Sequence, residues 1–172
     1  FHYFDNLEKY IQKNHLEWHI FIPTLPHLIN NIKIKTSNWK TKTFISSDID
    51  NFSKYYDDVF ISITCSGTAS LEIAKRNIPQ IVIYKLNFFT EIIIKLFVKV
   101  KNACLINIIS KKSIIPEIIN SNLTNKKLIK EFENLLNNED VRINQIEEVN
   151  RYIPNIEKDE SPYDISTKRI LS

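Results

Sequence analysis

Glycine is nearly absent from the chain, which has Gly67 and no other glycine among its 172 residues. Average usage of about 7% would place roughly twelve glycines in a chain of this length. A P-loop, a G-x-G-x-x-G dinucleotide turn and a G-x-S-x-G nucleophile elbow each need more than one glycine, so all three are excluded. A glycine retained in such a composition is expected where the backbone needs a positive φ angle.

Cysteine and long apolar runs are scarce as well. Cys65 and Cys104 are too few for a disulfide framework or a four-ligand zinc site, and they suit a reducing compartment. Cys65 is expected to be a buried structural thiol, because no histidine motif accompanies it as a nucleophile would require. No uninterrupted apolar run is long enough to span a membrane, and no signal peptide is visible. Because the sequence opens at Phe1 without methionine, we expect a fragment or an excised domain.

The charge is nearly balanced, with 23 basic and 20 acidic residues and a formal net charge of +3. This excess is too small to indicate nucleic-acid binding, so no nucleic-acid partner is expected. Hydrophobic residues make up 43% of the chain and charged residues 25%, as in a soluble globular domain. The four histidines fall in the first 27 residues without a metal-ligand pattern. We expect neither a metal nor a cofactor.

Helical and strand patterns alternate along the chain. Helices are predicted over 3–14, 25–34, 48–56, 69–76, 88–98 and from 124 almost to the end with breaks near 137–138 and at 154, and strands over 18–23, 43–46, 58–64, 79–84 and 103–107. This alternation indicates an α/β fold, a Rossmann-like open parallel sheet flanked by helices with a helical C-terminal extension. We predict one domain over 1–154 and a C-terminal helix over 155–172. The strand 79–84 is apolar and β-branched, as in strands buried on both faces.

Ser66, Gly67 and Thr68 stand between a predicted strand and a predicted helix, at the sheet edge where open α/β proteins bind ligands. The glycine permits a tight turn, and the hydroxyls with the free N–H groups of the helix start suit an anion such as a pyrophosphate. Glu72 lies one helical turn beyond Thr68, where a carboxylate can accept hydrogen bonds from the vicinal hydroxyls of a ribose. The alternative is a capped helix in which Glu72 pairs with Arg76.

The run Ser66-Gly-Thr-Ala-Ser-Leu-Glu72, followed by Pro79-Gln-Ile-Val-Ile-Tyr-Lys85 and Leu105-Ile-Asn107, resembles the lipid-A-disaccharide synthases. The match continues in order, with family spacing, over further segments: 22–28, Thr90, 98–100, 114–117 and 161–171. The resemblance implies a membrane-associated glycosyltransferase of the two-domain GT-B architecture. Such an enzyme condenses UDP-2,3-diacylglucosamine with 2,3-diacylglucosamine 1-phosphate, giving lipid A disaccharide 1-phosphate and UDP, without a required metal.

Only the carboxyl-terminal, UDP-sugar-binding half of that family is resembled. The family's amino-terminal domain, which binds the lipid acceptor and carries the proposed catalytic base, is expected to be missing. So is the Leu-Pro-Gly-Ser-Arg loop that would lie just before Phe1 and grip the donor phosphates. We therefore expect no catalytic residue in this chain and no activity of the chain alone.

The resemblance also implies roles for particular residues. Ser66, Gly67 and Thr68 would form the turn on the phosphate side, and Glu72 would hold the ribose.

Three further donor contacts are implied beyond this turn. Tyr84 and Lys85 match an aromatic-basic pair at a strand end, although a solvated lysine is the competing interpretation. Asn107 matches an asparagine at the donor site that would serve the uracil or the sugar, and otherwise it is a turn residue. The chain departs from the family at Ile106, where proline is usual, and at 111–112, where Gly-Lys or Gly-Arg is usual.

Two other functions remain open from the sequence. One is another GT-B enzyme acting on UDP-sugars, such as the peptidoglycan glucosaminyltransferase or a 2-epimerase. The other is a non-enzymatic nucleotide- or lipid-binding module. The apolar segment 88–100 and its flanking lysines either lie on an anionic bilayer or pack on the sheet. We expect a cytoplasmic protein, peripheral on the inner face of the bacterial inner membrane.

Overall fold

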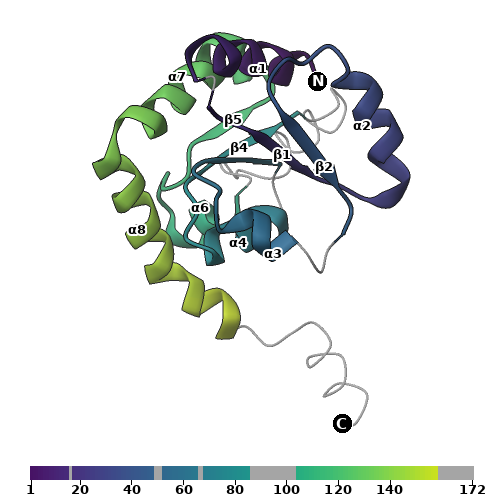
Figure 1. The fold of residues 1–172 in the computed structure, drawn as a ribbon. Coiled ribbons are helices and arrows are strands. Elements are labelled where there is room, and N and C mark those ends of the chain that lie inside the picture. The colour runs from purple at the N-terminus through teal and green to yellow at the C-terminus, as the bar shows by residue number, and fades with distance from the viewer. Residues whose placement is uncertain (16, 49–51, 66–67, 86–103, 159–172) are drawn as a thin grey trace, which may run out of the picture.

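The computed structural model describes residues 1–15, 17–48, 52–65, 68–85 and 104–158 (Figure 1). In chain order, the elements are α1 (His2–Asn14), β1 (Ile20–Pro23), η1 (Pro26–Leu28), α2 (Ile29–Lys35), β2 (Thr43–Ser46), α3 (Phe52–Tyr56), β3 (Ser62–Cys65), α4 (Thr68–Lys75), β4 (Gln80–Tyr84), α6 (Leu105–Ser110), β5 (Glu117–Ile119), η3 (Asn120–Asn122), α7 (Asn125–Asn137) and α8 (Glu139–Lys158). The predicted α/β class is confirmed, with parallel strands, flanking helices and a helical C-terminal part.

The strands of the described residues pair only in parallel, and they form two sheets. β1 pairs with β2, and a three-stranded sheet has the order β3-β4-β5. In the larger sheet Val82 lies between Thr64 of β3 and Glu117 of β5. The parallel strands are therefore divided between two sheets, whereas the sequence predicted a single open sheet.

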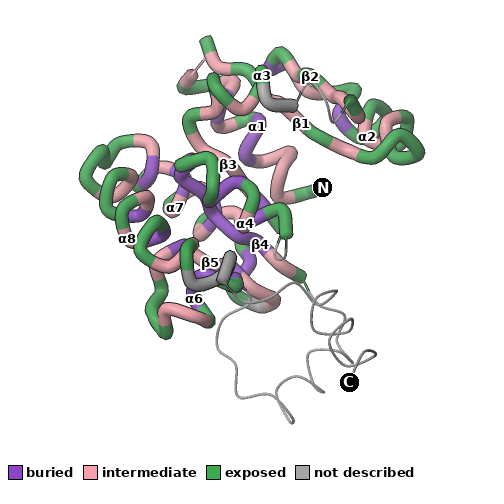
Figure 2. The backbone as a smooth tube through the Cα atoms, turned by 90° about the horizontal axis from the view of Figure 1, so that it is seen from below, coloured by how far each residue is buried: buried purple, intermediate pink, exposed green. Residues whose placement is uncertain are grey.

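β4 is the buried centre of the fold, as its apolar β-branched sequence predicts. Ile81 and Ile83 pack against α1 and α7, whereas Val82 packs against α4, α6 and α8 on the other face. Figure 1 shows α1 and α7 on one side of this sheet and α4 and α6 on the other. Figure 2 shows the burial concentrated on β4, whereas β1, β2 and α2 contribute no buried residue.

The prediction of a strand over 103–107 is wrong. Cys104 is the N-cap of α6, and the third strand of the larger sheet is β5, at which the Val82 N–H donates to the Pro116 carbonyl at 2.9 Å. A short apolar run fits a buried strand and a half-buried helix equally well by periodicity. Here tertiary contacts decide, because the Glu117 carboxylate accepts a hydrogen bond from the Cys104 N–H at 3.2 Å where the helix begins.

The C-terminal helices agree with the prediction at one break and not at the other. α7 ends at Asn137 and α8 begins at Glu139, as the paired asparagines predict. The predicted break at Pro154 is wrong, since α8 continues through it to Lys158. A proline there removes one helical hydrogen bond but lies only about one turn from the helix end. The predicted helix 88–98 and residues 159–172 lie outside the described residues.

Lys111 ends α6 in the left-handed conformation, with φ 55° and ψ 23°. Left-handed backbone crowds the Cβ atom and costs a residue other than glycine roughly 1–2 kcal/mol. The family resemblance places a glycine at this position. Lys111 therefore carries backbone strain at the turn between α6 and β5.

We predict that Lys111→Gly raises the free energy of unfolding by about 0.5–1 kcal/mol, the relieved strain exceeding the added entropy of the unfolded chain. The matched control is Lys130→Gly on the exposed face of α7, which should lower it by a similar amount. Urea unfolding of both variants measures the two effects. Equal signs for the two substitutions would contradict the strain.

Candidate functional site

The predicted site lies at the carboxyl edge of the larger sheet. β3 and β4 both end there, and α4 begins there at Thr68. Tyr84 is the last residue of β4 and Lys85 follows it directly. Thr68 and Lys85 are exposed and Tyr84 is half-buried. The topology therefore brings these three residues to one edge, which is where ligands bind in open α/β sheets.

The turn itself is only partly described. Ser66 and Gly67 lie outside the described residues, so their predicted phosphate contacts stay a prediction. Cys65, expected to be buried, is exposed, and Cys104 is the buried thiol. The reason is positional, because Cys65 is the last residue of β3, where the chain leaves the sheet.

Glu72 lies on the exposed side of α4, with 57% of its side chain accessible. Its Oε1 atom is 3.5 Å from Nη2 of Arg76, so the i,i+4 pair weighed as an alternative does form. The Arg76 guanidinium lies 4.5 Å from the centroid of the Tyr56 ring, which it covers. A carboxylate offers about four lone-pair positions, so the long contact to Arg76 leaves capacity for ribose hydroxyls.

The charges of Glu72 and Arg76 affect the pKa of the nearby Tyr56 phenol. Partial burial raises the pKa of the phenol, and the negative charge of Glu72 raises it further. The positive charge of Arg76 opposes the change but is the weakest of the three effects. Tyr56 is therefore neutral at physiological pH, and Arg76 and Glu72 are the charged pair beside it.

Asn107 lies in the interior, with 0% of its surface accessible. Its Nδ2 donates to the Ile115 carbonyl at 2.7 Å and to Oε1 of Glu117 at 2.6 Å. Its Oδ1 accepts from the N–H groups of Ile114 and Ile115 at 2.9 and 3.0 Å. The side chain therefore holds the segment 114–117 against α6, and the predicted contact of Asn107 with a donor stays a prediction.

Glu117 is a structural partner that the sequence reasoning did not single out. Its carboxylate accepts from Asn107 through one oxygen and from the Cys104 N–H through the other. The signal was present, since the residue closes the matched segment 114–117 at the family spacing. No local pattern connects it to α6, because the contact depends on the tertiary fold.

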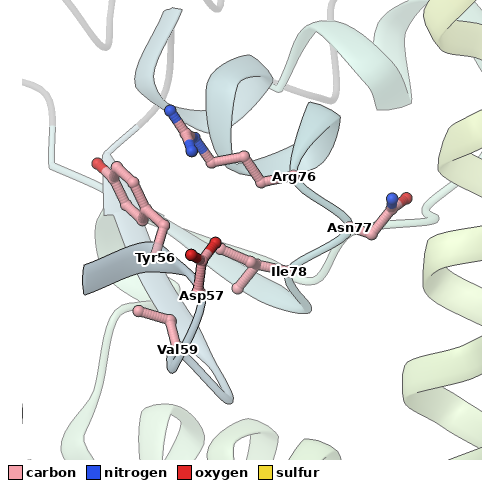
Figure 3. Close-up of a pocket in the computed structure, with 6 residues that line it drawn as sticks. All are labelled: Tyr56, Asp57, Val59, Arg76, Asn77 and Ile78. Atoms are coloured by element: carbon pink, nitrogen blue, oxygen red, sulfur yellow. The ribbon is translucent and has the colours of Figure 1, made fainter. Parts of the chain in front are cut away.

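A cavity of about 400 Å³ lies beside Arg76, the ion-pair partner of Glu72 (Figure 3). Its lining residues are Tyr56, Asp57, Val59, Arg76, Asn77 and Ile78. Val59 precedes β3 and Ile78 precedes β4, which places the cavity at the amino edge of the sheet. Figure 3 shows the Arg76 side chain reaching over toward Tyr56, with Asn77 set apart from them. Arg76 thus connects the wall of this cavity to Glu72.

Two features are absent from the described part of the chain. No group of three or more histidine, cysteine, aspartate and glutamate side chains there is arranged to hold a metal ion. Among the same residues, no helix combines the length and the apolar character that crossing a bilayer requires.

Comparison with known proteins decides the family. A family model described as lipid-A-disaccharide synthetase matches residues 4–167. The chain belongs to the lipid-A-disaccharide synthase family. The family expected from the sequence motifs is thereby confirmed.

Three lipid-A-disaccharide synthases illustrate the relationship. The one from Rickettsia prowazekii (strain Madrid E) is 33% identical over 136 residues, covering 78% of this chain and 33% of that protein. The one from Gluconobacter oxydans (strain 621H) is 30% identical over 115 residues, covering 67% and 28%. The one from Rhodospirillum centenum (strain ATCC 51521 / SW) is 23% identical over 163 residues, covering 89% and 40%. The matched part of the chain thus spans between a quarter and two fifths of these lipid-A-disaccharide synthases.

We predict that Asn107→Ala lowers the free energy of unfolding by about 3 kcal/mol or more, since it leaves several buried backbone and carboxylate groups unpaired at about 1–3 kcal/mol each. The matched control is Asn134→Ala on the exposed face of α7, expected to change stability by less than about 0.5 kcal/mol. Chemical denaturation followed by circular dichroism measures both. A loss below 1 kcal/mol for Asn107→Ala would contradict the structural role.

Proposed function

We propose that this chain is the carboxyl-terminal, donor-binding half of a lipid-A-disaccharide synthase. The observation that carries the proposal is the placement of Thr68 and Glu72. Both are exposed on the first turns of α4, directly after the carboxyl end of β3, within a chain of this family. The proposed ligand is UDP-2,3-diacylglucosamine, with the lipid acceptor bound by a domain outside this chain.

The proposed roles divide the donor between two groups of residues. The turn at Ser66, Gly67 and Thr68, with the N–H groups at the start of α4, takes the diphosphate, since a helix start attracts anions. Glu72 accepts hydrogen bonds from the ribose hydroxyls, as a carboxylate paired with vicinal hydroxyls can. Its contact with Arg76 at 3.5 Å lies on the same exposed side of the helix.

Tyr84 and Lys85 complete the edge on the neighbouring strand. Lys85 is exposed directly after β4 and adds a positive charge where the diphosphate would lie. During transfer the bond from the sugar C1 to the diphosphate breaks, and negative charge develops on the departing UDP. Positive groups aimed at that charge stabilise the transition state more than the ground state.

The membrane association is a separate proposal with a separate basis. It depends on the sequence of segment 88–100, which lies outside the described residues, and on the lipid nature of the proposed substrates. Amphipathic helices that carry basic and apolar residues bind the interface of anionic bilayers. We propose a peripheral position on the cytoplasmic face of the inner membrane.

We predict that Glu72→Gln weakens UDP binding about tenfold, or about 1.4 kcal/mol, because a neutral amide replaces the charged acceptor. Glu72→Ala should weaken it further. Neither should change stability by more than about 0.5 kcal/mol, since the exposed pair with Arg76 contributes little. Isothermal titration with UDP and thermal melting of the same samples measure the two effects.

Two controls accompany this titration. Asp57→Asn changes the charge of the cavity at the opposite edge and should leave UDP affinity unchanged. ADP and GDP should bind more weakly than UDP if the site reads the base. A Glu72→Ala variant that binds UDP within twofold of the unmodified chain would refute the site.

We also predict that the purified chain forms no lipid A disaccharide from donor and acceptor, because acceptor site and catalytic base are proposed to lie elsewhere. The assay is product formation detected by mass spectrometry, with a complete synthase as positive control. Disaccharide formed by this chain alone would overturn the division of roles between the halves.

A further inference from the structure

We propose that Gln80 is a positioning residue for the donor site, fixing the start of α4 on the sheet through its side-chain amide. The inference rests on the proposed donor binding. Gln80 touches no part of the proposed ligand, and it acts through the placement of Thr68 and Glu72.

The contacts of Gln80 connect two elements of the site. Its Nε2 donates to the carbonyl of Ser70 on α4 at 2.8 Å. Its Oε1 accepts from the hydroxyl of Thr64 on β3 at 2.9 Å. All three residues are buried, with 1% of the surface of Gln80 accessible. The amide therefore ties a helix and a strand together through the core.

The attachment point lies in the middle of the proposed site. Ser70 is two residues after Thr68 and two before Glu72, and its backbone is held while those neighbours face solvent. Apolar packing between a helix and a sheet is non-directional and tolerates small sliding or rotation. A buried hydrogen bond has a preferred length and angle, so this contact restricts how far α4 can shift along β3 or turn about its axis.

A second glutamine provides the matched control. Gln145 of α8 accepts from the Gln80 N–H at 2.7 Å and donates to the Gln80 carbonyl at 3.2 Å. It is buried as well. Its amide thus fixes the backbone of β4 to α8, and within the described part of the chain it forms no hydrogen bond to α4 or Thr64. Loss of either glutamine leaves buried polar groups unpaired, and only Gln80 reaches the site.

The experiment compares Gln80→Met with Gln145→Met, since methionine keeps the length and removes the amide. Both should lower the melting temperature, because each leaves buried hydrogen-bonding groups unsatisfied. At a temperature where both are folded, Gln80→Met should weaken UDP binding about fivefold, whereas Gln145→Met should change it by less than about twofold.

A double-mutant cycle measures the coupling between Gln80 and Glu72 in UDP binding, which a loss of stability alone would not change. If Gln80 places Glu72, then Glu72→Gln should weaken UDP binding less in the Gln80→Met background than in the unmodified chain, because the two residues act on one contact. In the Gln145→Met background the full effect of Glu72→Gln should remain. If the Gln80→Met variant does not fold, Thr64→Val takes its place in both comparisons. That substitution removes one of the two side-chain hydrogen bonds of Gln80.

The outcomes separate this inference from the proposed function. Failure of the unmodified chain to bind UDP would overturn both. UDP binding that depends on Glu72 but is unchanged by Gln80→Met, or equally weakened by both methionine variants, would overturn the positioning role and leave the donor site standing.

Discussion

The burial of β4 on both faces is the constraint on which the rest of the fold depends. Ile81 and Ile83 require one apolar layer, which α1 and α7 provide, and Val82 requires another, which α4, α6 and α8 provide. The polar groups of a strand that is buried on both faces cannot form hydrogen bonds with water. The first residue of β4, Gln80, therefore has hydrogen-bond partners within the protein for its backbone N–H and carbonyl and for both ends of its side-chain amide.

Polar side chains hold several loops of this chain in place, where other chains use tight glycine turns. Asn107 holds segment 114–117, and Oε1 of Glu8 accepts from the N–H groups of Lys40 and Thr41 at 2.8 and 2.9 Å. Both side chains are buried, so they satisfy backbone groups that water cannot reach. Among the described residues, positive φ angles occur at Asn77, Lys111 and Asn120, and asparagine is among the residues that tolerate them best. A chain with one glycine thus relies on buried polar side chains and on residues with a positive φ angle.

Local sequence patterns predicted the elements whose conformation does not depend on distant tertiary contacts. The strand 43–46 and the buried strand at 79–84 agree with β2 and β4 to within a residue, because β-branched runs bounded by polar residues have few other uses. The strand prediction for 103–107 was wrong because Leu105 and Ile108 are exposed in α6. Their exposure depends on the tertiary contact between Asn107 and Glu117. The exposed position of Glu72 and its ion pair followed from helical spacing alone. The burial of Asn107 did not, since its partners come from a later turn of the chain.

The amide of Gln145 also completes the pairing of β4 at a point that its neighbouring strand does not reach. β5 begins opposite Val82, so the upstream hydrogen-bonding groups of β4 at Gln80 lie beyond the end of its strand partner. A buried N–H or C=O group left without a partner there would cost free energy. Here a glutamine from α8 occupies the position with an amide that imitates a peptide group, accepting from the Gln80 N–H and donating to the Gln80 carbonyl. The same residue that anchors α8 therefore completes the hydrogen bonding of β4 where its strand partner ends.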